Sequence, residues 1–78
     1  MRQIDNALCN ENFGKFIREE RERQGLYQSD LAAKLGITQA YYSHIERGTR
    51  TVDFTMALNI CLALGLDINE FIKVQMDL

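Results

Sequence analysis

Residues 28–48 constrain the fold of this chain more than any other stretch, because they encode two short helices on either side of a tight turn. The apolar residues Leu31 and Leu35 are four apart, which places both on one face of a first helix. Gly36 follows as a residue that readily takes the left-handed conformation with which helices end. Thr38 then supplies a hydroxyl that can cap a second helix. The chain therefore makes two helices that meet across a turn of about three residues.

The second of these helices has one apolar side and one hydrogen-bonding side. Tyr42 and Ile45 are three residues apart and form the apolar side, and Arg47 and Gly48 end the helix. A helix fits the major groove of B-DNA, where a glutamine amide pairs with adenine and an alanine or an aromatic ring meets a thymine methyl group. The opposite side of the helix is therefore suited to base edges. It comprises Gln39, Ala40, Ser43, His44 and Arg47.

A pattern of residues at fixed spacings includes the two helices and extends through most of the chain. Within and beside the two helices it comprises Leu26, Gln28, Leu31, Ala32, Leu35, Gly36, Thr38 and the run Ile45-Glu46-Arg47-Gly48. Outside them it comprises Ile17, Arg18, Arg21, Ala63-Leu64-Gly65 and Glu70-Phe71. Over about residues 13–72, this pattern resembles the Cro and phage-repressor family of bacterial helix-turn-helix DNA-binding domains, and the chain looks like a small stand-alone member similar to restriction–modification controller proteins.

The resemblance implies an all-α fold, a compact five-helix bundle of the lambda-repressor-like DNA-binding type. Its second and third helices form the helix-turn-helix, with the second laid over the DNA backbone and the third in the major groove. Members of the family usually bind DNA as dimers. We therefore expect a homodimer on a pseudo-palindromic operator of double-stranded DNA, with the two recognition helices about 34 Å apart.

The polar residues on this framework divide the expected DNA contacts into two sets. Base contacts are expected from Gln39, Ala40, Tyr41, Ser43 and His44. Phosphate contacts are expected from Tyr27, Gln28, Arg47, Thr49 and Arg50. Three residues keep a second interpretation: Tyr41 as half-buried packing, His44 as a simply exposed histidine, and Arg50 as a solvated charge.

Gln28 and Tyr27 stand at the start of the first of the two helices. The free backbone N–H groups and the positive end of a helix favour phosphate, and the Gln28 amide adds a further donor. The resemblance implies that Gln28 also supports Gln39. Tyr27 departs from the family, which usually has serine or threonine at this N-cap. The tyrosine weakens the cap by about 1 kcal/mol and leaves open whether its phenol reaches a phosphate instead.

Arg21 and Glu46 are two charges that the helix patterns place near the core. The apolar stripe through Phe13 and Ile17 continues four residues on to Arg21, and a buried charge needs a partner. Glu46 is unfavourably placed as well, because its carboxylate lies at the end of its helix, where the helix dipole is negative. A structural salt bridge between the two residues solves both problems, and the family resemblance implies the same pair. The alternative is two independently solvated charges.

Three further helices complete the predicted domain. The first starts near Asn10 or Asn12 and runs to about Gln24. The inward stripe of the fourth, after the N-cap Asp53, comprises Phe54, Ala57, Leu58, Cys61 and Leu64. The inward residues of the fifth, after a capping box over residues 67–70, are Ile68, Phe71 and Ile72. The expected organisation is a leader over residues 1–10, a DNA-binding domain with C-terminal dimerisation helices over residues 11–75, and a tail over residues 76–78.

Apolar residues that these stripes leave over indicate the dimer interface. They are Met56, Leu62, Val74, Met76 and Leu78. Several of them lie near one end of the chain, which favours a homodimer contact. The alternative is a scatter of apolar surface residues, which monomers tolerate.

The net charge of −2 is unusual for a DNA-binding domain, which is expected to be basic. Residues 1–50 carry eight Lys and Arg against seven Asp and Glu, whereas residues 51–78 carry one against four. The acidity therefore lies mostly away from the two central helices. Few phosphate contacts predict weak non-specific binding and a shallow salt dependence, so affinity depends on dimerisation and specific contacts.

Other classes of protein find little support in the sequence. One histidine and two separated cysteines make no metal-ligand cluster, and no Ser/His/Asp, Cys/His or paired-carboxylate set indicates an enzyme. No stretch has the roughly 20 apolar residues of a membrane span, and residues 1–5 lack the apolar core of a signal peptide. We expect a cytoplasmic protein with reduced cysteines, no cofactor, no metal and no membrane partner.

The leading hypothesis is a small transcriptional regulator that acts by occluding a promoter or by contacting RNA polymerase. The alternative is a protein-interaction module, such as an antitoxin whose acidic, apolar C-terminal region binds a protein partner. Co-purification of a partner favours the second hypothesis over the first.

Overall fold

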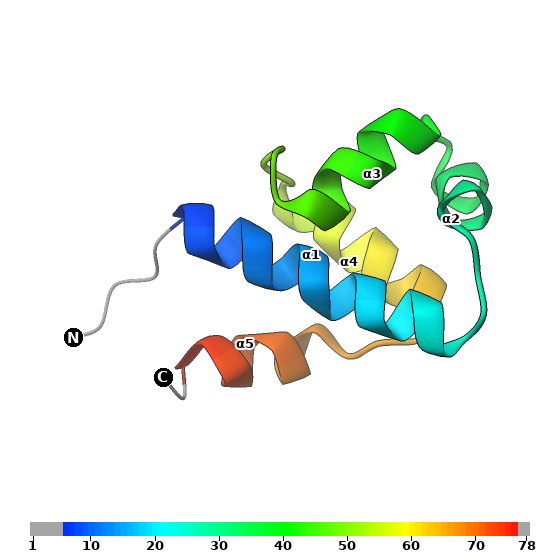
Figure 1. Cartoon of the computed structure of the whole chain (residues 1–78). Helices are drawn as coiled ribbons and strands as arrows, with labels where there is room; N and C mark the ends of the chain where they lie inside the picture. The colour runs from blue at the N-terminus through cyan, green and yellow to red at the C-terminus, as the bar shows by residue number, and fades with distance from the viewer. Residues whose placement is uncertain (1–5, 77–78) are drawn as a thin grey trace.

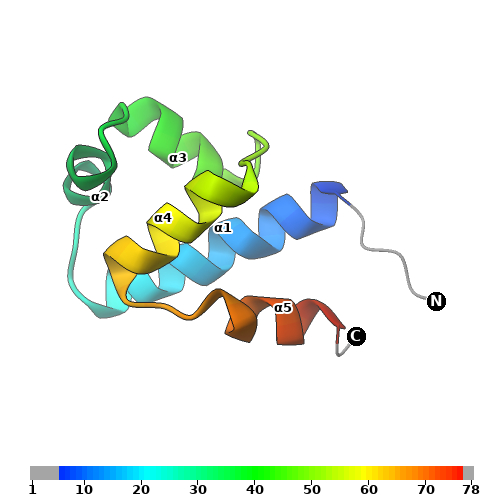
Figure 2. The same cartoon turned by 180° about the vertical axis from the view of Figure 1, so that it is seen from behind.

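The computed structural model describes the backbone of residues 6–76 and the side chains of residues 7–73. Over these residues the chain forms five helices and no strand: α1 (Asn6–Arg23), α2 (Gln28–Leu35), α3 (Gln39–Arg47), α4 (Phe54–Leu64) and α5 (Ile68–Met76). Helix α1 runs through the middle of the molecule, with α3 and α5 on opposite sides of it (Figure 1). Helix α4 packs across the face of α1 that the reverse view brings to the front (Figure 2). The predicted all-α, five-helix architecture is confirmed.

The first helix begins earlier than the sequence pattern predicted. A start at Asn10 or Asn12 was expected, whereas α1 begins at Asn6. The prediction was wrong because Ala7 and Leu8 favour helix, and no glycine or proline separates them from the apolar stripe that follows. Half of the expected leader is therefore part of the main helix of the domain.

The ends of the predicted domain are only partly described. Residues 6–10 of the expected leader belong to α1, and α5 extends through Met76. Residues 1–5 of the expected leader and residues 77–78 of the expected tail lie outside the described part of the chain.

The core is built mainly from α1, α2, α3 and α4. Its most deeply buried side chains are Ile17, Leu31, Tyr42, Ile45 and Ile60. Helix α5 joins this core through aromatic rings, because the centroid of Phe71 lies 5.3 Å from that of Phe13 and 5.5 Å from that of Phe16. The near-perpendicular Phe13–Phe71 pair has the edge-to-face geometry that aromatic rings prefer.

The inward stripes of the last two helices differ from the predicted ones. Phe54 is 67% exposed, Ile72 is 43% exposed and Leu58 is only half-buried, whereas Ile60, which the predicted inward stripe does not include, is fully buried. Phe54 is the first residue of α4 and lies at the rim of the core. The buried residues of α4 keep the ideal helical spacing. They are Ala57, Ile60, Cys61 and Leu64.

The crossing of α1 and α3 is unusually close and depends on a glycine. A Cβ atom on Gly14 would lie 2.2 Å from the carbonyl oxygen of Glu46 and 2.7 Å from that of Ile45. Both obstacles are backbone atoms, which a side-chain rotation cannot move away. The missing side chain of Gly14 therefore lets the last turn of α3 rest directly on α1.

The turn between α2 and α3 follows the predicted chemistry. Gly36 takes the left-handed conformation, with φ of 68°, immediately after the last residue of α2. The Thr38 hydroxyl accepts a hydrogen bond from the backbone N–H of Tyr41 at 3.1 Å and caps α3. These two residues set the direction of α3 relative to α2.

Candidate nucleic-acid interface

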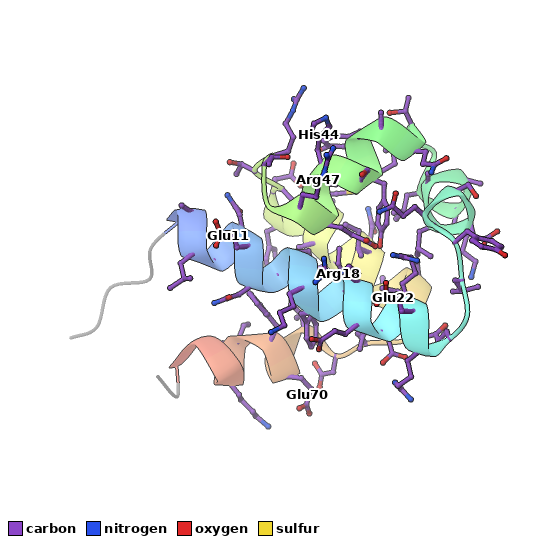
Figure 3. The ribbon with its side chains drawn as sticks, viewed as in Figure 1. Glu11, Arg18, Glu22, His44, Arg47 and Glu70 are labelled. Atoms are coloured by element: carbon purple, nitrogen blue, oxygen red, sulfur yellow. The ribbon has the colours of Figure 1, made fainter. Side chains whose placement is uncertain are left out.

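One side of α3 is turned away from the rest of the molecule. Gln39 and Ala40 are exposed in its first turn, and Ser43 and His44 are half-buried one turn later. His44 and Arg47 project from the side of α3 that faces away from α1 (Figure 3). We call the side formed by these five residues the outer face of α3. Its members are small or carry hydrogen-bonding groups, which suits contact with base edges.

The opposite side of α3 anchors the helix to the core. Tyr42 and Ile45 have exposed fractions of 0% and 1%. Tyr41 is half-buried and packs against the core cluster, in line with the packing interpretation of this residue. A base contact by Tyr41 stays a prediction, because a half-buried side chain keeps part of its surface exposed.

Arg21 and Glu46 form a buried ion pair between α1 and α3. The Arg21 Nε atom donates to Glu46 Oε2 at 2.6 Å, and Nη2 donates to Oε1 at 3.0 Å. The third guanidinium nitrogen donates to the carbonyl oxygen of Leu26 at 2.8 Å. The side chains of Arg21 and Glu46 are only 10% and 1% exposed. This bidentate geometry holds the end of α3 against α1 and satisfies both charges away from water.

The environment of the pair shifts the pKa values of three groups. Burial by itself raises the pKa of Glu46, but hydrogen bonds from Arg21 and Gln28 outweigh it and hold that pKa below its ordinary value. The Glu46 carboxylate in turn raises the pKa of Arg21. Burial, followed by the same carboxylate, raises the pKa of Tyr42 far above the usual range for tyrosine. The charged form of the pair is therefore the stable form in the folded protein.

Gln28 links the start of α2 to this pair. Its Nε2 atom donates to Glu46 Oε1 at 3.1 Å. A glutamine amide carries two N–H donors and a carbonyl acceptor, so one donor and the acceptor are left for other partners. The support that the resemblance predicted between Gln28 and Gln39 is not tested by these contacts, and neither is a phosphate contact of Gln28.

Tyr27 precedes α2 and is 75% exposed. The N-cap is completed by another residue, because the Asp30 carboxylate accepts the backbone N–H of Tyr27 at 2.7 Å. The sequence signal for this bond was an acidic residue three positions after the cap, which is half of a capping box. The phenol of Tyr27 is thus available to solvent beside the N-terminus of α2.

The segment after α3 carries the other expected phosphate contacts. Arg47, Thr49 and Arg50 are all exposed. The Thr49 hydroxyl and the Arg47 guanidinium both lie near the imidazole of His44, at 2.8 Å and 3.4 Å from Nδ1. Contacts of these three residues with DNA stay predictions.

Sequence patterns gave no sign of two other contacts. Gln24 Nε2 donates to the carbonyl oxygen of Leu64 at 2.7 Å and joins the end of α1 to the end of α4. The close approach at Gly14 was missed as well, because an isolated glycine in a helix has several explanations and the sequence alone does not choose among them.

An apolar groove of about 300 Å³ lies where α1, α4 and α5 meet. We call this feature the α1/α4/α5 groove. Its lining is mostly apolar and comprises Cys9, Asn10, Phe13, Val52, Asp53, Phe54, Ala57, Ile68, Phe71 and Ile72. Phe54 and Ile72 leave exposed apolar surface at its rim, which sequence patterns did not predict.

The residues predicted for the dimer interface do not gather in this groove. Met56 is half-buried and packs against the core cluster, so part of its surface is used within the subunit and its role in an interface stays a prediction. Leu62 is 76% exposed. The side chains of Val74, Met76 and Leu78 lie outside the described residues.

The described part of the chain shows no metal site and no membrane-spanning helix. Residues 7–73 hold no group of three or more His, Cys, Asp and Glu side chains that could bind a metal ion. None of the five described helices is long and apolar enough to cross a membrane. Cys9 and Cys61 are free thiols, and burial raises the pKa of Cys61.

The chain is similar to known regulatory proteins. The sequence profile of the helix-turn-helix family matches residues 17–71. The chain is 36% identical over 62 residues to an uncharacterised helix-turn-helix transcriptional regulator, y4dL, of Sinorhizobium fredii; this match covers 80% of the chain but only 32% of that relative. It is 34% identical over 59 residues to the control protein C.MunI of a Mycoplasma species, covering 74% of the chain and 80% of the relative.

Among solved structures, the fold is similar to that of a DNA complex. The restriction–modification controller protein C.Esp1396I, a tetramer bound to its natural 35 base-pair operator, superposes with a TM-score of 0.74 and 25% identity. The superposition covers 88% of this chain and 91% of that one. The likeness therefore extends over most of both chains.

Proposed function

This chain belongs to the helix-turn-helix family, and on that premise we propose that it is a transcriptional regulator that binds an operator in double-stranded DNA through α3. The observation that carries the proposal is the outer face of α3, where Gln39 and Ala40 are exposed while Tyr42 and Ile45 are buried. The similarity to a controller protein solved in complex with its operator supports operator binding by this chain. We propose no catalytic activity, since the relatives are named as regulators or control proteins.

In this arrangement the N-terminal end of α3 lies deepest in the major groove. Gln39, Ala40, Tyr41, Ser43 and His44 contact bases. Tyr27, Gln28, Arg47, Thr49 and Arg50 contact phosphates around the groove. The bound protein acts either by occluding a promoter or by contacting RNA polymerase.

Replacing Gln39 by alanine is expected to weaken base discrimination at one position per half-site. The difference in binding free energy between the preferred base and the other bases should fall there by about 1–3 kcal/mol, because the bidentate amide contact is lost. Selection of bound sequences from a random DNA pool measures this, with the wild type and the variant compared at one salt concentration. Asn69→Ala, which removes an exposed amide from α5, is the matched control and should leave the selected sequence unchanged. An identical selected sequence for Gln39→Ala would contradict the assignment of Gln39.

We further propose that the regulator is a homodimer and that its subunits meet over the α1/α4/α5 groove. Phe54 and Ile72 leave much apolar surface exposed at the rim, on elements that the outer face of α3 does not use. Exposed apolar surface that gathers around a groove is typical of an interface. A two-fold axis there gives both subunits the same contact and matches a pseudo-palindromic operator.

Phe54→Lys is expected to convert the dimer to a monomer at micromolar concentration, because it places a charge in the apolar contact. Sedimentation velocity measures the change, and circular dichroism checks that the exposed substitution leaves the fold intact. Leu62→Lys introduces the same charge at an exposed residue that the sequence pattern assigned to the interface but that does not line the groove, and it should leave the dimer unchanged if the subunits meet over the groove. A dimer that is lost only with Leu62→Lys, or a monomeric wild type, would refute the groove as the interface.

A further inference from the structure

The end of α3 holds the single histidine of the chain between two neighbours. The Thr49 hydroxyl oxygen lies 2.8 Å from His44 Nδ1, and Arg47 Nη2 lies 3.4 Å from the same nitrogen. Both neighbours thus contact Nδ1, and the other ring nitrogen, Nε2, can bind a different partner. Figure 3 shows His44 and Arg47 on the side of α3 that faces away from α1.

Helix termination brings Thr49 back to a residue five positions earlier. Gly48 is left-handed, with φ of 74°, and its N–H donates to the carbonyl oxygen of Ile45 at 3.1 Å. The backbone N–H of Thr49 donates to the carbonyl oxygen of His44 at 3.0 Å. These two bonds make a Schellman motif, which fixes the backbone of Thr49 beside the imidazole.

The contacts at Nδ1 indicate which nitrogen carries the proton. A neutral imidazole has one donor and one acceptor nitrogen, and an arginine guanidinium only donates. Arg47 can therefore donate a hydrogen bond to Nδ1 only when that nitrogen carries the lone pair. A proton on Nδ1 would instead point at the positive charge of the Arg47 guanidinium. The Thr49 hydroxyl has one proton and two acceptors within reach, the His44 carbonyl oxygen at 3.2 Å and Nδ1 at 2.8 Å. The shorter contact, together with the Arg47 donor at the same nitrogen, favours donation of this proton to Nδ1.

We propose that Thr49 and Arg47 hold His44 in one orientation and one tautomer, with the lone pair on Nδ1 and the proton on Nε2. His44 then offers DNA a fixed hydrogen-bond donor. This inference rests on the proposed function, in which the outer face of α3 meets DNA. In the major groove a single donor matches a purine N7, guanine O6 or thymine O4 and disfavours the amino group of cytosine. A phosphate oxygen is the other acceptor that such a donor can meet. Thr49 and Arg47 are positioning residues in this scheme.

The tautomer is tested on the free protein, without DNA. Nitrogen-15 NMR of the one imidazole is recorded under mildly alkaline conditions, where imidazoles are neutral. We expect the wild type and Thr49→Ser, which keeps the hydroxyl, to show an unprotonated Nδ1 and a protonated Nε2. Thr49→Val keeps the shape without the hydroxyl and should move both nitrogens toward the average of two exchanging tautomers. A protonated Nδ1 in the wild type, or the same spectrum for Thr49→Val, would overturn the proposal.

The consequence for recognition is tested on the selected operator. Thr49→Val should weaken binding about fivefold, the effect of one ordinary hydrogen bond, while Thr49→Ser restores it. In a His44→Ala background the same substitution should have a clearly smaller effect, which separates positioning of His44 from the phosphate contact proposed for Thr49 itself. A 7-deazaguanine or a methylphosphonate placed at the affected position shows whether the acceptor is a base or a phosphate. Unchanged affinity for Thr49→Val would overturn the role in binding. Absence of any DNA binding by the wild type would instead refute the proposed function, and the NMR result would still decide the tautomer.

Discussion

Gly14→Ala is expected to destabilise the protein by about 3 kcal/mol, near the upper end of the range for overpacked sites. The new Cβ would lie 2.2 Å from the carbonyl oxygen of Glu46, so α1 and α3 must move apart. That movement also strains the Arg21–Glu46 pair, which joins the same two helices. Thermal unfolding followed by circular dichroism should show a Tm lower by roughly 10–25 °C for a domain of this size.

Helix propensity and the close contact between α1 and α3 predict opposite signs for the change in stability of Gly14→Ala. Alanine is the better helix former, and on helix propensity alone Gly14→Ala stabilises a helix by about 1 kcal/mol. Lys15→Ala, at the exposed neighbouring position of α1, is the control and should change the free energy of unfolding by less than about 0.5 kcal/mol. A stabilised Gly14→Ala variant would show that α1 and α3 do not approach as closely as described.

Glu46→Gln is expected to cost about 3 kcal/mol of the free energy of unfolding, because it leaves the buried Arg21 guanidinium without a counter-charge. The substitution keeps the shape of the side chain, so the loss reports on charge and hydrogen bonding more than on packing. Urea unfolding with linear extrapolation measures the difference. Glu22→Gln removes a glutamate whose side chain is 62% exposed and 4.0 Å from the same guanidinium, and should cost less than about 0.5 kcal/mol.

The same pair predicts how stability depends on pH. The folded-state pKa of Glu46 lies below its ordinary value, so its contribution to stability is fully present above about pH 4.3 and is lost as the pH falls through the folded-state pKa. Below that range the wild type should therefore lose part of its advantage over Glu46→Gln. Equal costs for Glu46→Gln and Glu22→Gln, at neutral pH and in acid, would contradict a buried charged pair.

Local sequence signals were sufficient for most of the helix ends. Gly36 and Gly48 take the left-handed conformation that ends α2 and α3, and the side chains of Thr38 and Asp53 cap α3 and α4 as expected. Each of these features depends on a few neighbouring residues, which is why the pattern alone identifies them. The order and number of helices followed from the same signals.

Features set by contacts between distant parts of the chain were harder to predict. The exposure of Phe54 and the burial of Ile60 depend on where α4 begins relative to the rim of the core. The need for Gly14 depends on how closely α3 approaches α1. Periodicity gives the faces of a helix, but it does not give the position of its neighbours along it.

The candidate site divides in the same way. The outward position of Gln39 and Ala40 followed from helical spacing, and the Arg21–Glu46 pair followed from two charges that both needed a partner. The contact of Thr49 with His44 was not predicted, because it depends on the backbone path beyond the end of α3. The amide of Gln28 donates to Glu46, a contact that becomes visible only once the ion pair is placed.

The most direct test of the central claim, that DNA meets the outer face of α3, is chemical-shift mapping by NMR with a selected operator duplex. We predict that the largest amide shift changes fall on the start of α2, on α3 and on residues 49–50, and that α5 is affected only where subunits meet. Shift changes concentrated on α5 and the second half of α4, with α3 unchanged, would contradict the claim.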